Sequence, residues 1–168
     1  MTDPLETRIH GALNQLDIEY ELMECDPNLA DTAIFCEHYG IAPGNSANTI
    51  IVTSKSGEKK FAACVLLSNT RLDVNKTVRK RLGARRISFA SPQETSELTG
   101  MVLGGVTPLA LPDGLALWVD HRVMKADFII LGGGTRSSKI KISPAVFFKT
   151  PNTEIIEGLA KPIPSNTD

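Results

Sequence analysis

The sequence lacks the features that mark membrane, secreted or disulfide-bonded proteins. No apolar run approaches the ~20 residues that a membrane-spanning helix needs. Residues 1–4 contain no basic segment followed by an apolar one, as a secretory signal would. The three cysteines, Cys25, Cys36 and Cys64, are odd in number and form no CxxC pair, so no disulfide framework is expected. These absences favour a cytoplasmic protein in a reducing compartment.

An excess of charge of one sign is also missing. Lys and Arg number 18 and Asp and Glu 19, for a formal net charge of −1. Bulk charge therefore gives no support for non-specific binding to nucleic acid, and any RNA contact has to come from a local patch. His10, His38 and His121 lie far apart without metal-ligand spacing, and no GxSxG elbow is present. The sequence predicts no metal and no organic cofactor.

What is present is the composition of a folded domain. The chain has 168 residues, of which 42% are hydrophobic and 22% charged, which suits one domain with a substantial core. We expect a single domain over residues 1–161 and a flexible tail over residues 162–168.

Hydrophobic periodicity predicts alternating helices and strands. Residues 3–6 and 91–94 have the form of helix starts, each with a capping residue, a proline and a glutamate. Residues 49–54 and 61–67 are strand-like runs separated by a turn signal, which predicts a hairpin. A hairpin breaks a pure βαβ pattern. The sequence therefore predicts an α+β fold, with a curved mixed β-sheet surrounded by helices.

Two glycine-rich loops are candidates for chemistry. The first contains Gly100, Gly104, Gly105 and Pro108, between a capped helix and a strand. Backbone N–H groups in such a loop can approach a ligand closely, and converging amides could stabilise the oxyanion of an attacked ester. The alternative is a tight connection whose glycines only satisfy unusual dihedral angles.

The second loop is formed by Gly132, Gly133, Gly134 and Thr135 after an apolar strand. Its amides could contact a phosphate or carboxylate. It matches neither a Walker A loop nor a GxGxxG motif, and a flexible hairpin turn is the alternative.

A basic cluster of Lys76, Arg79, Lys80 and Arg81 lies within about one helical turn. It could contact RNA phosphates, or it could be an ordinary solvated helix face. The sequence leaves both readings open.

An ordered series of segments extends over about residues 31–144. Its members are Gly40-Ile41-Ala42-Pro43-Gly44, Ala47-Asn48-Thr49-Ile50-Ile51, Leu82-Gly83-Ala84-Arg85-Arg86, Ala90-Ser91-Pro92-Gln93-Glu94, the loop from Gly100 to Pro108, Asp120, and the glycine segment leading to Ile142-Ser143-Pro144. In order and spacing the series resembles the YbaK/prolyl-tRNA-synthetase-associated (ProX-like) family of aminoacyl-tRNA editing domains.

The resemblance implies a mixed α+β fold and a free-standing deacylase. Its reaction would be hydrolysis in trans of the ester that links a wrong amino acid to tRNA, with water as the nucleophile. The implied partner is mischarged tRNA, with a synthetase or another translation component as a further candidate, and neither DNA nor a membrane. The implied role is translation fidelity in the cytoplasm, without a metal or other cofactor.

The resemblance also implies a set of site residues. The catalytic residues would be Gly104, Gly105 and Asn48. The amides of Gly104 and Gly105 would hold the ester carbonyl beside Asn48. The substrate-binding residues would be Gly100, Thr107, Pro108, Asp120, Gly132, Gly133, Gly134 and Thr135. The tRNA-binding residues would be Lys76, Arg79, Lys80 and Arg81.

One position departs from the family. Where the family usually carries a lysine in an Ala-Lys-Thr segment, this chain has Ala47-Asn48-Thr49, and Asn48 supplies hydrogen bonds without charge. If the site otherwise keeps family geometry, Asn48→Lys is expected to raise deacylation. Two alternatives stay open, a family member that binds tRNA or a small ligand without turnover, and a hydrolase of small esters or amides unrelated to tRNA.

Overall fold

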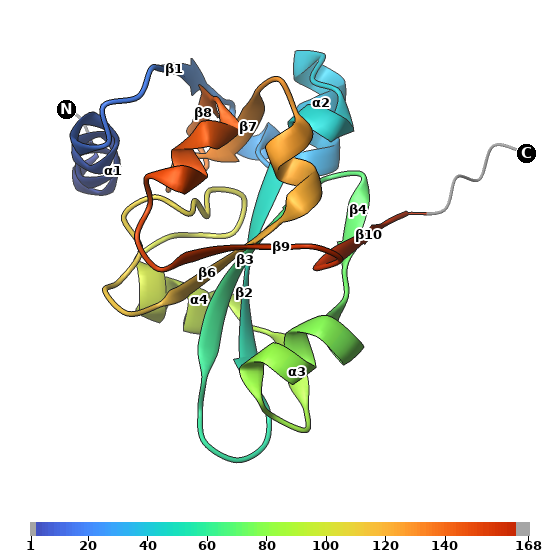
Figure 1. Cartoon of the computed structure of the whole chain (residues 1–168). Coiled ribbons are helices and arrows are strands. Elements are labelled where there is room, and N and C mark those ends of the chain that lie inside the picture. The colour runs from blue at the N-terminus through green and yellow to red at the C-terminus, as the bar shows by residue number, and fades with distance from the viewer. Residues whose placement is uncertain (1–2, 164–168) are drawn as a thin grey trace, which may run out of the picture.

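The computed structural model describes residues 3–163 (Figure 1). The helices, with 3₁₀ and π turns labelled η, are α1 (Pro4–Gln15), η1 (Pro27–Leu29), α2 (Thr32–Tyr39), η2 (Pro43–Asn45), η3 (Val74–Val78), α3 (Arg79–Leu82), α4 (Pro92–Thr99), η4 (His121–Lys125) and η5 (Pro144–Phe148). The strands are β1 (Tyr20–Glu24), β2 (Ala47–Ser54), β3 (Phe61–Leu67), β4 (Thr70–Leu72), β5 (Ile87–Phe89), β6 (Ala116–Asp120), β7 (Ile129–Gly132), β8 (Ser138–Ile142), β9 (Thr153–Ile156) and β10 (Ala160–Pro162).

The largest sheet has five strands in the order β5-β2-β3-β6-β9. Strands β2 and β3 form the predicted antiparallel hairpin, and β5 joins β2 in antiparallel orientation. Strands β3 and β6 are parallel, as are β6 and β9. The sheet is therefore mixed, and the predicted fold class is confirmed.

A second, smaller sheet lies against the start of β2. It has the order β1-β8-β7, with both pairs antiparallel. A parallel bridge between Ser46 and Ile130 joins the residue before β2 to β7. The start of β2 therefore lies against the second sheet, beneath α2 in Figure 1.

Both predicted helix starts are confirmed. The carboxylate of Asp3 accepts a 2.8 Å hydrogen bond from the Leu5 amide at the start of α1. Ser91 and Glu94 form a reciprocal capping box at the start of α4. Each side chain supplies a partner to an amide that the helix itself leaves unpaired.

The two faces of the five-stranded sheet are both covered. One face packs on α1 and the second sheet, through a cluster that includes Ile9, Leu13, Ile51, Leu131 and Ile140. The other face packs on η3 and α3, through a cluster that includes Val52, Val78, Leu82, Trp118 and Leu159. The three cysteines are buried and free, as expected of small hydrophobic residues.

The end of the described chain is held in place. Pro162 pairs with Thr70 in the two-stranded sheet β10-β4, and the Ile163 amide donates to the Asn69 carbonyl oxygen over 3.1 Å. The expected tail is therefore wrong for residues 162 and 163, and residues 164–168 lie outside the described residues. Within residues 3–163 no helix combines the length and apolarity needed to cross a bilayer.

Candidate functional site

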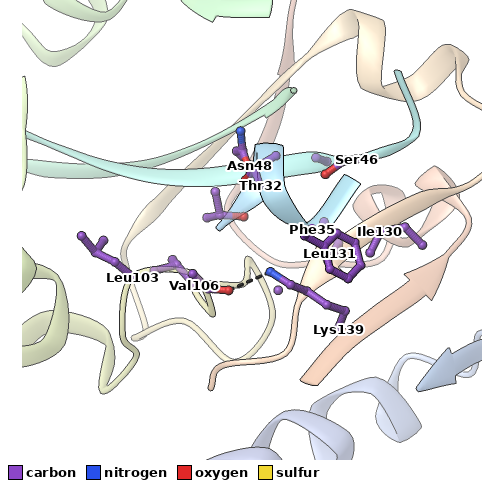
Figure 2. Close-up of a pocket in the computed structure, with 13 residues that line it drawn as sticks. Thr32, Phe35, Ser46, Asn48, Leu103, Val106, Ile130, Leu131 and Lys139 are labelled. Atoms are coloured by element: carbon purple, nitrogen blue, oxygen red, sulfur yellow. Dashed lines mark hydrogen bonds between the residues drawn. The ribbon is translucent and has the colours of Figure 1, made fainter. Parts of the chain in front are cut away.

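A small pocket opens where the two sheets meet, beside the N-terminal end of α2. Its volume is about 90 Å³. Five segments contribute its walls: α2, the start of β2, the loop 103–106, β7 and β8. The lining residues are Thr32, Phe35, Ser46, Ala47, Asn48, Thr49, Leu103, Gly104, Val106, Ile130, Leu131, Gly132 and Lys139. Figure 2 shows Lys139 reaching toward the loop 103–106, with Asn48 and Thr32 across the pocket.

Lys139 lies on β8, and its side chain lines the pocket. Its Nζ donates hydrogen bonds to the carbonyl oxygens of Gly104 over 2.7 Å and Ala30 over 2.9 Å. The ammonium also lies 5.1 Å from the ring centroid of Phe35. The side chain therefore ties the loop 103–106 to the segment before α2.

Arg136, in the connection between β7 and β8, also links the loop 103–106 to the segment before α2. Its Nη1 donates to the Leu103 carbonyl oxygen over 3.0 Å and to the Asp31 carboxylate over 2.9 Å, and its Nε donates to the Pro27 carbonyl oxygen. Two consecutive carbonyl groups, those of Leu103 and Gly104, are thus each held by a cation from the β7–β8 connection or β8 itself.

Burial sets the electrostatics of Lys139. The residue is 7% exposed, and desolvation lowers the pKa of its ammonium below the ordinary lysine value. No carboxylate in the described part of the chain lies within ion-pair distance of Nζ. Asp31, the carboxylate that acts on the pKa of Lys139, forms its ion pair with Arg136, whose hydrogen bond lowers the pKa of Asp31. Lys139 is therefore a buried cation that, among residues 3–163, is held by two neutral carbonyl oxygens and the Phe35 ring.

Asn48 stands on the opposite wall. Its Oδ1 accepts a 2.5 Å hydrogen bond from the Thr32 hydroxyl, which leaves the Nδ2 donors without a partner among residues 3–163. The neighbouring Thr49 hydroxyl is buried and also has no hydrogen-bond partner there. A buried hydroxyl without a partner costs free energy, and a ligand that hydrogen-bonds to it removes that cost.

Of the predicted catalytic group, Asn48 and Gly104 line one pocket, but Gly105 does not. The Gly105 amide already donates to the Val102 carbonyl oxygen over 2.9 Å. A Cβ at position 105 would collide with the backbone of Gly134 and Thr135. Gly105 therefore allows two loops to touch, and the expectation that both amides face the ester carbonyl is wrong for Gly105.

The second glycine loop has the same packing role. Gly132 lines the pocket, but a Cβ there would meet the backbone of Gly105 and Val106. Gly133 and Gly134 lie outside the pocket, and their Cβ positions are filled by Ser138 and by Ile9 with Leu5. Thr135 also lies outside, and its hydroxyl donates to Glu6 over 2.7 Å. Of these four predicted substrate-binding residues, only Gly132 lines the pocket.

Gly100, Thr107 and Pro108 are not in the pocket either. Gly100 is the left-handed residue that ends α4, and Thr107 is fully buried. Pro108 lines a separate hollow of about 270 Å³ between α1 and β6. The loop 100–108 therefore contributes to the pocket only through its middle.

Asp120 is buried at the end of β6, away from the pocket lining. Its carboxylate accepts a hydrogen bond from the Ala160 amide over 3.2 Å and lies 3.5 Å from Nδ1 of His121. These contacts fix β10 to the main sheet. The predicted substrate-binding role of Asp120 is therefore not supported by its position.

The basic cluster lies at the other end of β2 from Asn48 (Figure 1). Lys76, Arg79, Lys80 and Arg81 are exposed on η3 and α3. Arg81 pairs with Glu154 over 2.6 Å. The eight residues of β2 span roughly 25 Å at the strand rise of about 3.3 Å, so the cluster is well separated from the pocket.

Sequence reasoning missed Lys139 and Thr49. Thr49 belongs to the segment Ala47-Asn48-Thr49 but was given no role, and Lys139 belongs to no motif. The available signal was the position of Lys139 just after a glycine-rich turn, on a strand otherwise rich in isoleucine. What makes Lys139 unusual is burial against Ala30 and Gly104, which are remote in sequence.

Several residues that line the pocket therefore carry hydrogen-bond donors without a partner among residues 3–163. The donors without a protein partner are the Asn48 amide group, the Gly104 amide and the Thr49 hydroxyl, with Lys139 beside them. Within the described residues no group of three or more His, Cys, Asp or Glu is placed to hold a metal ion. Such a donor set is suited to polarising a carbonyl group.

Comparison with known proteins gives a consistent match. A family model described as an aminoacyl-tRNA editing domain matches residues 26–150. Over 119 residues the chain is 25% identical to the multifunctional Ser/Thr-tRNA deacylase ProXp-y of Escherichia coli (strain K12), covering 70% of this chain and 71% of the relative. The same identity and coverage hold for ProXp-y of Escherichia coli O157:H7.

Two solved structures share the fold. One is described as a trans-editing enzyme for prolyl-tRNA synthetase, with a TM-score of 0.79 and 20% identity over 96% of this chain and 99% of that one. The other is a hypothetical protein, with a TM-score of 0.80 and 22% identity over 92% of this chain and 99% of that one.

Proposed function

Because this chain belongs to the family of aminoacyl-tRNA editing domains, we propose that it hydrolyses the ester bond of tRNA mischarged with a small amino acid. Asn48 and Gly104, which the family resemblance put beside the ester carbonyl, border the same pocket, and that observation carries the proposal. Water attacks the ester carbonyl carbon. The unpartnered donors of the pocket hold the carbonyl oxygen as it becomes negative.

Pocket size supports a small amino acid. The pocket has a volume of about 90 Å³. A cavity that accepts benzene measures about 150 Å³, so an aromatic side chain exceeds this pocket. The matched relative named as a Ser/Thr-tRNA deacylase acts on amino acids of the size that fits.

The basic cluster supplies a second contact in the proposal. The single-stranded 3′ end of tRNA separates the ester from the duplex of the acceptor stem. Lys76, Arg79 and Lys80, which are exposed at the far end of β2, would contact phosphates of that stem while the ester occupies the pocket. Arg81 is partly committed to Glu154 and contributes less.

The test is turnover against tRNA charged with alanine, serine, threonine or phenylalanine. We expect release of at least one of the small amino acids and no release of phenylalanine. Release is measured as loss of acid-precipitable labelled amino acid, with the reaction without protein subtracted. Hydrolysis of none of the small aminoacyl esters would refute the proposed activity, and binding of the same tRNAs without hydrolysis would favour a binding module.

A further inference from the structure

Lys139 is a buried cation that has no anionic partner among residues 3–163. It is 7% exposed, and its hydrogen bonds in the described residues go to the carbonyl oxygens of Ala30 and Gly104. Burying an ammonium group is unfavourable unless another charge compensates it, and backbone carbonyl groups compensate only in part. A residue that served only to tie two loops could do so at lower cost with a neutral side chain.

The ammonium has one donor to spare. Of its three N–H groups, the two carbonyl oxygens occupy two. The side chain lines the pocket, with Asn48 on the opposite wall. The third N–H is therefore available to a ligand, in the space where no other cation lies among the lining residues.

The surroundings of Lys139 favour an anion in that space. Asp31, Arg136, Cys25 and Cys36 are the titratable or charged groups that influence it from the packed elements. Arg136 neutralises Asp31 at the rim, and both cysteines are buried thiols. Among the described residues that line the pocket, Lys139 is the only charged one, so a group that becomes negative there is stabilised.

We propose that Lys139 is a catalytic residue that supplies, from β8, the positive charge that Asn48 does not supply from β2. This inference rests on the proposed function. The water oxygen forms a bond to the ester carbonyl carbon, and the electron pair of the carbonyl bond moves to its oxygen, which Lys139 contacts. As the carbonyl bond re-forms, the bond to the ribose oxygen breaks. One proton of the water ends on that ribose oxygen, and Lys139 keeps its own proton throughout.

If Lys139 only supported the fold, its substitution would affect stability and rate differently. Four variants separate this structural role from the catalytic one. Lys139→Met removes the charge, and Lys139→Arg keeps a charge on a larger group. Lys139→Met with Asn48→Lys moves the ammonium to the opposite wall. Lys141→Met is the matched control, because Lys141 lies on the same strand but is more exposed, over Phe128 at 4.4 Å.

The measurement is the single-turnover deacylation rate on the small aminoacyl-tRNA that the wild-type protein hydrolyses fastest, with melting temperatures alongside. We expect Lys139→Met to lose roughly 100-fold, as removal of an oxyanion donor does, while remaining folded. The relocated lysine should recover at least about tenfold of that loss, and Lys141→Met should keep the wild-type rate.

The outcomes separate the inference from the function. A folded Lys139→Met protein at the wild-type rate overturns the role of Lys139 but leaves the deacylase proposal standing. A wild-type protein that hydrolyses no small aminoacyl ester overturns the function itself. If Lys139→Met does not fold, Lys139→Arg decides: a rate within about tenfold of wild type supports the charge, and a folded Lys139→Arg protein without activity counts against it.

Discussion

The ammonium group of Lys139 donates a 2.7 Å hydrogen bond to the carbonyl oxygen of Gly104, a residue 35 positions away in the sequence. Asn48 faces both across a pocket of about 90 Å³. Lys139 therefore supplies a cation to the pocket, whereas the sequence, with Asn48 in place of the usual family lysine, predicted no charge there. It also fixes the loop whose Gly104 amide has no hydrogen-bond partner among residues 3–163.

The rate and the stability should respond to pH in opposite directions. Burial lowers the pKa of Lys139, and Asp31, Arg136, Cys25 and Cys36 are the other groups acting on it. Because the protonated form is the active one, deacylation should fall as pH rises through the lowered pKa. In the window between that pKa and the ordinary lysine value near ~10.4, the unfolded chain binds more protons, so stability should rise with pH.

Both quantities are best measured as differences between wild type and Lys139→Met, because other lysines and tyrosines titrate in the same range. Rates are corrected for hydrolysis without enzyme at each pH. A pH profile of the Lys139→Met protein with the same alkaline fall would assign that fall to another group.

The unpartnered hydroxyl of Thr49 gives a prediction with an internal control. Thr49→Val keeps the shape and removes a buried hydroxyl that has no partner, so stability should be unchanged or higher by up to about 1 kcal/mol. If the hydroxyl contacts substrate, deacylation should fall about tenfold, the rate equivalent of one hydrogen bond. Thr107→Val is the control, because the Thr107 hydroxyl is equally orphaned but lies outside the pocket lining.

Thermal melts and single-turnover rates on both variants test this prediction. We expect Thr107→Val to match Thr49→Val in stability and wild type in rate. Equal rate losses in both variants would show that the hydroxyls act through the fold and not through substrate.

Gly105→Ala should lower stability as well as activity. The new Cβ would collide with the backbone of Gly134 and Thr135, and backbone cannot rotate away as a side chain can. Overpacking of this kind typically costs about 1–3 kcal/mol, read as a fall in melting temperature. The control is Gly11→Ala, in the exposed interior of α1 with open space around its Cβ, where helix propensity predicts a gain of up to about 1 kcal/mol. A Gly105→Ala protein as stable as wild type would mean that the two loops can move apart.

Local patterns in the sequence were sufficient for part of the fold and part of the site. The caps at Asp3 and Ser91 and the hairpin of β2 and β3 are decided within a few residues, and all three were predicted. The glycines of the two loops were recognised as special. Their reason, a backbone-to-backbone contact between Gly105 and Gly134, depends on two segments that meet only in the folded chain.

Lys139 could not be found in this way. A lysine on a strand is usually solvated, and the sequence of β8 does not distinguish Lys139 from Lys141. Burial of Lys139 follows from the positions of Ala30, Phe35 and Gly104, which three different segments contribute. Asp120 was misjudged for the complementary reason, because the end of a strand suggested a site and β10 covers it.

The basic cluster predicts salt-dependent affinity. Arg79 and Lys80 are exposed, and removing both charges should weaken tRNA binding and lower the slope of log affinity against log salt by about 1–2. Lys125→Ala is the control, an exposed lysine on η4. Binding isotherms at several salt concentrations measure the slope. An unchanged affinity and slope for Arg79→Ala with Lys80→Ala would assign these side chains to solvent.

The structure reverses the expectation for Asn48→Lys. From the sequence, a lysine at this position should raise deacylation by restoring the usual family charge. With Lys139 present, the substitution places two ammonium groups in one pocket of about 90 Å³. Two like charges near a protein surface repel by about 4 kcal/mol at about 4 Å and an effective dielectric constant of about 20, and by less at longer distance. That repulsion lowers stability or removes a proton from one of the amines.

We therefore expect Asn48→Lys alone to melt at a lower temperature than wild type and to hydrolyse the same small aminoacyl-tRNA no faster. Asn48→Ala loses the hydrogen bond from Thr32 but adds no charge, so it should melt below wild type and above Asn48→Lys, and it should lose up to about tenfold in rate through the missing Nδ2 donors. The two variants are compared in single turnover near pH 7, where an added lysine would ordinarily be charged. An Asn48→Lys protein faster than wild type would mean that the pocket lacked an effective cation, and the role assigned to Lys139 would then be wrong.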